Sequence, residues 1–148
     1  MPKIFLDSNV LVYYKDELSL FHKEVLSRLE EWMRSGTMFC ISPLVLDEFL
    51  YVLKFRYKDK KKNEIFQSLK KAVKEILEVP FIELVNSPTG LKDQIKVVEY
   101  MEKYNLCPRD AYHLLTMIYN KIDSFATFDT DFNKVFEDKL IYSNIRNI

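Results

Sequence analysis

Short apolar runs alternate with longer amphipathic segments along this chain, and this alternation constrains the fold more than any other feature. Five runs have the length and composition of buried strands: residues 3–6, 38–41, 81–85, 124–128 and 140–142. Parallel strands are joined by helices that cover both faces of the sheet, so the alternation favours a parallel arrangement. We therefore expect an α/β fold, a three-layer α/β/α sandwich around a central, mainly parallel sheet.

Six helices are expected between these runs. Four of them span residues 9–14, 21–34, 43–57 and 61–79, and two more begin behind Ser87-Pro88 and at Pro108. Proline is favoured in the first turn of a helix, and it ends a helix that runs into it. The helix behind Pro88 has an apolar stripe that should face the core, made of Leu91, Ile95, Val98 and Met101.

Composition limits the function classes. A chain of 148 residues fits one domain over 1–148, and its formal net charge of zero means that any basic surface is local. The two cysteines stand alone and no apolar run reaches about 20 residues, so we expect a cytoplasmic protein without a membrane span. The two glycines, Gly36 and Gly90, are too far apart for a phosphate-binding loop or a dinucleotide fingerprint.

Four acidic residues stand where the chain leaves a strand or enters a helix. Asp7 and Asp129 end strand-like runs, and Glu48 and Asp110 lie in the first turns of helices that begin at or just behind a proline. Strand ends in an α/β sheet open onto one crevice, where ligands usually bind. Carboxylates that meet there suit hard divalent cations such as Mg²⁺ or Mn²⁺ and indicate metal-assisted phosphodiester cleavage.

Each carboxylate also has an ordinary structural explanation, such as a helix cap or a turn. Glu48 in turn fits a solvated helix residue. Taken together the ordinary explanations weaken, because Glu48 shares a helix face with apolar neighbours such as Leu44 and Val52, where an unpaired charge is costly. Asp47, one position earlier, is a rival ligand, and periodicity alone leaves the choice open.

Three blocks of this sequence resemble the PIN domain family. They are residues 4–11 (IFLDSNVL), residues 42–49 (SPLVLDEF), and residues 108–114 (PRDAYHL) followed by 126–132 (ATFDTDF). The blocks occur in the family's order and span nearly the whole chain. The length is similar to that of the small stand-alone members, the VapC-type toxins of prokaryotic toxin–antitoxin pairs. The segment after Phe132 departs from the pattern, because it lacks a glycine expected before the last strand.

The resemblance implies a metal-dependent endoribonuclease that uses one or two Mg²⁺ or Mn²⁺ ions. It assigns the catalytic and metal-binding roles to Asp7, Glu48, Asp110 and Asp129, and so selects Glu48 over Asp47. Ser8, Asn9 and Asp131 would support this site. Water activated by the metal would attack the RNA phosphodiester and leave a 5′-phosphate and a 3′-hydroxyl.

The same resemblance implies an RNA substrate, a small antitoxin protein as partner, and a homodimer. Arg109 and the run Lys60, Lys61 and Lys62 are candidates for RNA contact. His113 shares a helix face with Asp110 and is a candidate to support the acidic site, although a packing role is favoured. Interfaces are expected at aromatic residues that exceed the needs of one core, namely Tyr13, Tyr14, Tyr51, Phe55 and Tyr57. Two alternatives remain: a housekeeping RNA-processing nuclease of the same superfamily, and a non-catalytic PIN-fold scaffold that binds RNA or protein.

Overall fold

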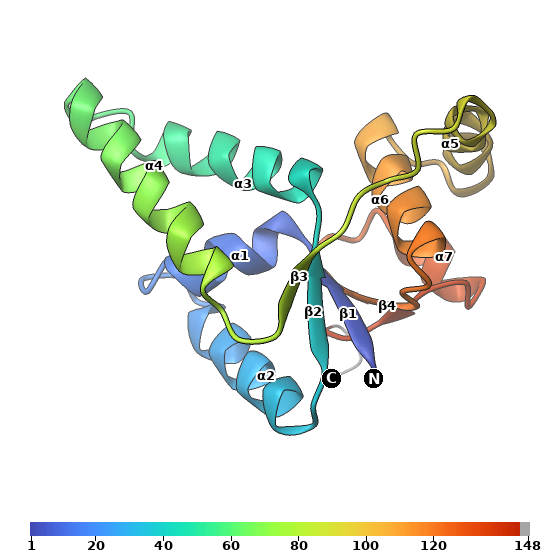
Figure 1. Cartoon of the computed structure of the whole chain (residues 1–148), viewed down its shortest axis with the longest axis horizontal. Helices are drawn as coiled ribbons and strands as arrows, with labels where there is room; N and C mark the ends of the chain where they lie inside the picture. Colours follow the sequence, from blue (N-terminus) through green and yellow to red (C-terminus); the bar gives the residue numbers. More distant parts are fainter. Residues whose placement is uncertain (146–148) are drawn as a thin grey trace.

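The computed structural model describes residues 1–145, and within them five strands form one sheet in the order β3-β2-β1-β4-β5 (Figure 1). These strands are β1 (Lys3–Leu6), β2 (Met38–Ile41), β3 (Ile82–Leu84), β4 (Ser124–Ala126) and β5 (Tyr142–Ser143). All four neighbouring pairs are parallel. The predicted parallel sheet is therefore confirmed, although the last three strands are shorter or shifted relative to the sequence expectation.

Helices cover both faces of this sheet, which confirms the three-layer sandwich. On one side lie α1 (Ser8–Lys15), α2 (His22–Arg34), α3 (Pro43–Arg56) and α4 (Lys62–Leu77) (Figure 1). On the other side lie α5 (Leu91–Tyr104), α6 (Pro108–Tyr119) and the short α7 (Asn133–Glu137). Central strands are consequently buried on both faces, and Phe5, Phe39 and Phe125 have no exposed surface.

Local chemistry explains where the helices around the sheet edge begin and end. Asp7 caps α1 by accepting a hydrogen bond from the Ser8 backbone N–H, and Ser42 caps α3 by accepting one from the Val45 N–H. Proline occupies the first turn of α3 and α6. Gly36 follows α2 at a φ of +75°, a conformation that glycine adopts without a Cβ clash. The starts of α1, α3 and α6 are thereby fixed beside the carboxyl ends of the strands.

The α5 region corrects two expectations. The helix begins at Leu91, behind Gly90, rather than directly behind Pro88. Three residues of the stripe expected to face inward are exposed: Leu91, Ile95 and Val98. Helix α5 carries apolar side chains on two sides. The side with Val97 and Tyr104 packs on the core, and the side with Leu91, Ile95 and Val98 is exposed. Helix α7 was not expected from the sequence.

Candidate active site

The four acidic residues predicted from the sequence lie at one edge of the sheet, beyond the carboxyl ends of its strands. Asp7 directly follows β1, and Asp129 lies three residues beyond the end of β4. Glu48 is in the second turn of α3 and Asp110 is in the first turn of α6. Strands β1 and β4 are neighbours although they are far apart in sequence. The sheet order reverses between them, and open α/β sheets bind ligands in the crevice at such a point.

Asp7 is held by neutral donors from three directions. Its carboxylate accepts hydrogen bonds from the Ser8 backbone N–H at 2.7 Å, the Thr127 hydroxyl at 2.6 Å and the Asn9 side-chain amide at 3.4 Å. Only 8% of the residue is exposed. Burial, which disfavours the charged form, raises the pKa of Asp7 even though the Thr127 hydrogen bond lowers it. The carboxylate is thus positioned but not neutralised.

Thr127 joins the first and last parts of the site and was not singled out from the sequence. Its hydroxyl donates to Asp7 and accepts from the Asp129 backbone N–H at 3.0 Å. The Asn9 amide lies 3.4 Å from the same hydroxyl and its carbonyl accepts from the Phe128 N–H. The sequence did offer a signal for Thr127. It is a polar residue directly after a buried strand, and that strand lies beside the one that Asp7 follows. Ser8 and Asn9, which were expected to support the site, both donate hydrogen bonds to Asp7.

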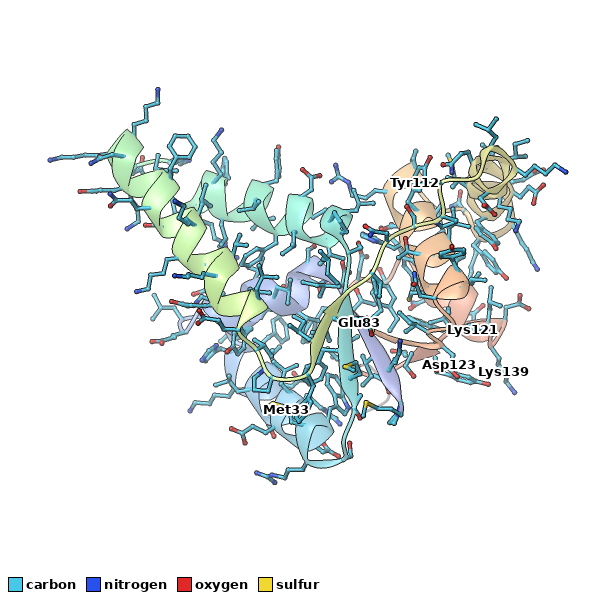
Figure 2. The ribbon with its side chains drawn as sticks, viewed as in Figure 1. Met33, Glu83, Tyr112, Lys121, Asp123 and Lys139 are labelled. Carbon is cyan, nitrogen blue, oxygen red and sulfur yellow. The ribbon has the colours of Figure 1, made fainter. Side chains whose placement is uncertain are left out.

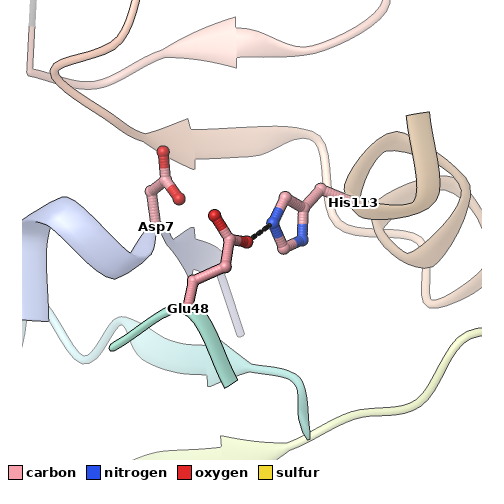
Figure 3. A group of neighbouring side chains, drawn as sticks. All are labelled: Asp7, Glu48 and His113. Atoms are coloured by element: carbon pink, nitrogen blue, oxygen red, sulfur yellow. Dashed lines mark hydrogen bonds and ion pairs between the residues drawn. The ribbon is translucent and has the colours of Figure 1, made fainter. Parts of the chain in front are cut away.

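His113 contacts Glu48 and is therefore more than the packing residue expected from the sequence. Its Nε2 donates a hydrogen bond to Glu48 Oε1, because a carboxylate can only accept (Figure 3). The ring is almost fully buried and packs against Phe5. Carboxylate oxygens of Asp7 and Glu48 and a ring nitrogen of His113 all lie within 4.8 Å of one another. The spacing of three residues between Asp110 and His113 places both on one helix face in the sequence, but it does not identify Glu48 as the partner of His113.

A second group of acidic side chains adjoins the first. Carboxylate oxygens of Asp110, Asp129 and Asp131 lie within 4.8 Å of one another. Burial raises the pKa of Asp110, and the negative charges of Asp129 and Asp7 raise it further. Asp131 is exposed, and its backbone N–H donates to the Asp129 carboxylate at 3.0 Å. The charges that crowd Asp110 would be offset by a bound cation.

These side chains line a groove of about 600 Å³. Glu48 and Leu44 form one wall, and residues 107–110, Tyr112, Asp129 and Asp131 form the rest. Arg109 is the only one of these lining residues, all within the described part of the chain, that carries a positive charge. Asp47 is outside both acidic groups, its side chain is 65% exposed, and it lies 3.9 Å from Arg109. Of the two rival carboxylates of α3, Glu48 therefore lies in an acidic group and Asp47 does not.

The donor set fits a hard divalent cation. The two groups supply oxygens from five carboxylates, and Mg²⁺ and Mn²⁺ prefer oxygen ligands. Burial raises the pKa of Asp7 and of Asp110 although His113 lies close enough to lower both, so a bound cation would favour the ionised form of these carboxylates further. Figure 3 shows the Glu48 carboxylate between Asp7, which follows β1, and His113 of α6. A cation between these carboxylates would offset their repulsion.

Comparison with known proteins identifies the family. The PIN domain family model matches residues 4–137, and the chain belongs to this family. It is 29% identical to Ribonuclease VapC6 and 33% identical to Ribonuclease VapC2, both of Methanocaldococcus jannaschii. The first match covers 89% of this chain and 92% of the relative, and the second covers 90% and 89%.

Solved structures share the fold. VapBC2 from Rickettsia felis, bound to a DNA fragment from its promoter, superposes with a TM-score of 0.65 at 17% identity. This match covers 96% of the present chain and 97% of that chain. At this identity the likeness concerns the fold alone. None of the helices in residues 1–145 combines the length and the apolar character that a bilayer crossing requires.

Proposed function

We propose that this protein is a divalent-metal-dependent endoribonuclease of the VapC type, the toxin of a toxin–antitoxin pair. One observation carries the proposal: two adjoining groups of acidic side chains lie at the carboxyl edge of the sheet, Asp7 with Glu48 and Asp110 with Asp129 and Asp131, and all of these residues except Asp7 line one groove. Membership of the PIN family and two relatives named as VapC ribonucleases support it.

Asp7, Glu48, Asp110 and Asp129 would hold one or two Mg²⁺ or Mn²⁺ ions, with Asp131 at the outer edge. A bound ion would supply water activation and neutralise the charge of the phosphate and of the leaving oxygen. Hydrolysis of this kind needs no covalent enzyme intermediate, and it leaves a 5′-phosphate and a 3′-hydroxyl.

The chain's own residues would position the groups that react. Thr127, Ser8 and Asn9 fix both oxygens of Asp7, and His113 fixes one oxygen of Glu48. Preorganised ligands need little rearrangement when the charge changes during the reaction. Arg109 lines the groove and would bind an RNA phosphate, which its planar guanidinium can grip with two hydrogen bonds.

Other RNA and protein contacts are proposed further along α3. The run Lys60, Lys61 and Lys62 lies at the turn between α3 and α4, which projects from the body of the molecule (Figure 1). Lysines there would meet RNA phosphates remote from the cut, since the turn is separated from Glu48 by two further turns of helix. Tyr51 and Phe55 are 76% and 65% exposed on α3 and are candidates for the antitoxin or dimer interface. Tyr13, Tyr14 and Tyr57 pack partly against the core and keep part of their surface exposed.

The test is cleavage of a structured RNA with Mn²⁺, with Mg²⁺ and with EDTA. Asp7→Asn should abolish a metal-dependent activity without unfolding the protein. Asp123→Asn is a matched control, because this exposed carboxylate precedes β4 at the opposite edge of the sheet (Figure 2). Activity that persists in EDTA or in Asp7→Asn would overturn the metal-site assignment. Absence of both cleavage and Mn²⁺ binding in calorimetry would favour the scaffold alternative.

A further inference from the structure

A second pocket continues the acidic groove along the same edge of the sheet. It has a volume of about 470 Å³ and lies between the first turn of α3, the segment after β3 and the middle of α6. Leu44 and Tyr112 line both cavities, so the two are neighbours separated by these two side chains. Figure 1 shows the connection from β3 to α5 passing between α3 and α6, and Figure 2 shows Tyr112 beside it. A strand of nucleic acid lying in the groove would therefore meet this pocket next.

The lining has the composition of a nucleobase site. Pro43, Leu44 and the ring of Tyr112 supply apolar surface, and flat bases stack on aromatic and apolar side chains. The Tyr112 hydroxyl donates to the Gln94 side chain at 2.9 Å. This hydrogen bond holds the ring from the far side and leaves its face available to a ligand.

Three polar side chains of the pocket have hydrogen-bonding capacity to spare. Within residues 1–145, the side chains of Asn86 and Ser87 make no hydrogen bond. Of Asn86, only the backbone carbonyl is bonded, and it accepts from the Asn120 side chain. Asp47 contributes a carboxylate, which is only loosely paired with Arg109 at 3.9 Å. Asp47 therefore offers acceptors to the pocket, whereas the metal-binding groups lie on the other side of Leu44.

We propose that this pocket is a subsite for the nucleobase adjoining the cleaved phosphodiester, and that Asp47 makes it select guanine. The Watson–Crick edge of guanine presents two adjacent N–H donors, at N1 and at the exocyclic amine, which match the two oxygens of a carboxylate. Uracil presents one N–H between two carbonyl oxygens, and a carboxylate repels those oxygens. The subsite deepens the proposed ribonuclease function and rests on it for its biological role.

Binding can be measured without catalysis. Isotope-labelled, metal-free protein is titrated with guanosine, adenosine, cytidine and uridine in EDTA, and NMR signals of Leu44, Asn86 and Tyr112 are followed. Guanosine should shift these signals and saturate them at a concentration about tenfold lower than uridine, the selectivity typical of one good bidentate pair. Asp47→Asn should remove this difference between the bases. Glu102→Gln, a matched control on the exposed side of α5, should keep it.

Cleavage provides the second measurement. Products from an RNA pool with randomised sequence should show guanine enriched at one position beside the cut, and Asp47→Asn should lose this enrichment. Equal binding of guanosine and uridine, or shifts confined to other parts of the protein, would overturn the subsite. If the wild-type protein cuts no RNA at all, the ribonuclease proposal fails while the nucleoside titration still decides on the pocket.

Discussion

Thr127→Val tests whether the acidic site depends on neutral donors. Valine has nearly the shape of threonine, and Thr127 is fully buried, so the substitution removes a hydroxyl without opening a cavity. It deletes the hydrogen bond to the Asp7 carboxylate at 2.6 Å and leaves the Asp129 N–H without its acceptor at 3.0 Å.

The expected loss follows from these two contacts. A hydrogen bond to a charged group contributes about 1.5–3 kcal/mol, and a neutral one about 1 kcal/mol. The Asp129 N–H is near solvent, so water replaces part of its bond. We expect the free energy of unfolding to fall by about 2–3 kcal/mol at neutral pH, and Mn²⁺ affinity to fall with it because Asp7 loses its orientation.

Urea unfolding in EDTA and in Mn²⁺, together with calorimetric titration of Mn²⁺, measures both effects. Thr37→Val is the matched control: Thr37 is also buried, but its hydroxyl pairs with the neutral Ser35 hydroxyl at 3.0 Å, just before β2. It should cost about 1 kcal/mol and leave Mn²⁺ affinity intact. The reasoning is refuted if Thr127→Val loses no more stability than Thr37→Val and binds Mn²⁺ like the wild type.

Three further substitutions probe other parts of the structure. Burial raises the pKa of Asp7, so the folded state binds the proton of this carboxyl more tightly than the unfolded state does. The contribution of Asp7 to the free energy of unfolding therefore falls as pH rises from the unfolded-state pKa to the folded-state pKa, and it is lost above the folded-state pKa. Asp7→Asn should therefore stabilise the metal-free protein at neutral pH, flatten the pH dependence of urea unfolding below neutrality and abolish stabilisation by Mn²⁺; a less stable variant in EDTA contradicts this. Lys121 lies two residues beyond the end of α6, in the left-handed region at a φ of 55°, so Lys121→Gly should raise the free energy of unfolding by about 1 kcal/mol. Lys134→Gly inside α7 should lower it as the contrast. Charge reversal in the 60–62 run should weaken RNA binding and flatten its salt dependence, whereas an unchanged salt slope in filter binding would show a merely solvated turn.

The parallel sheet and its layers could be predicted from the sequence because strand length, proline positions and apolar periodicity are local signals. The four acids could be placed at one edge, since strand ends in such a sheet share an edge. The inward face of α5 could not be predicted, because apolar residues recur on two of its sides and only packing decides between them. The roles of Thr127 and His113 depend on partners 120 and 65 positions away in the chain, and no periodicity reports a contact of that kind.

The choice of donors around Asp7 has a physical reason. A lysine or arginine against this carboxylate would stabilise the empty site, but a permanent cation would compete with a metal ion for the same oxygens. Hydroxyl, amide and backbone N–H groups orient the carboxylate and leave its charge in place. The cost of that charge is recovered on binding, because a ligand specific to the folded state stabilises it by about 2.7 kcal/mol at a concentration one hundred times its Kd. The nearby Arg109 lies 3.9 Å from Asp47, outside the acidic groups, and this exposed, loose pair leaves the guanidinium able to contact a substrate phosphate.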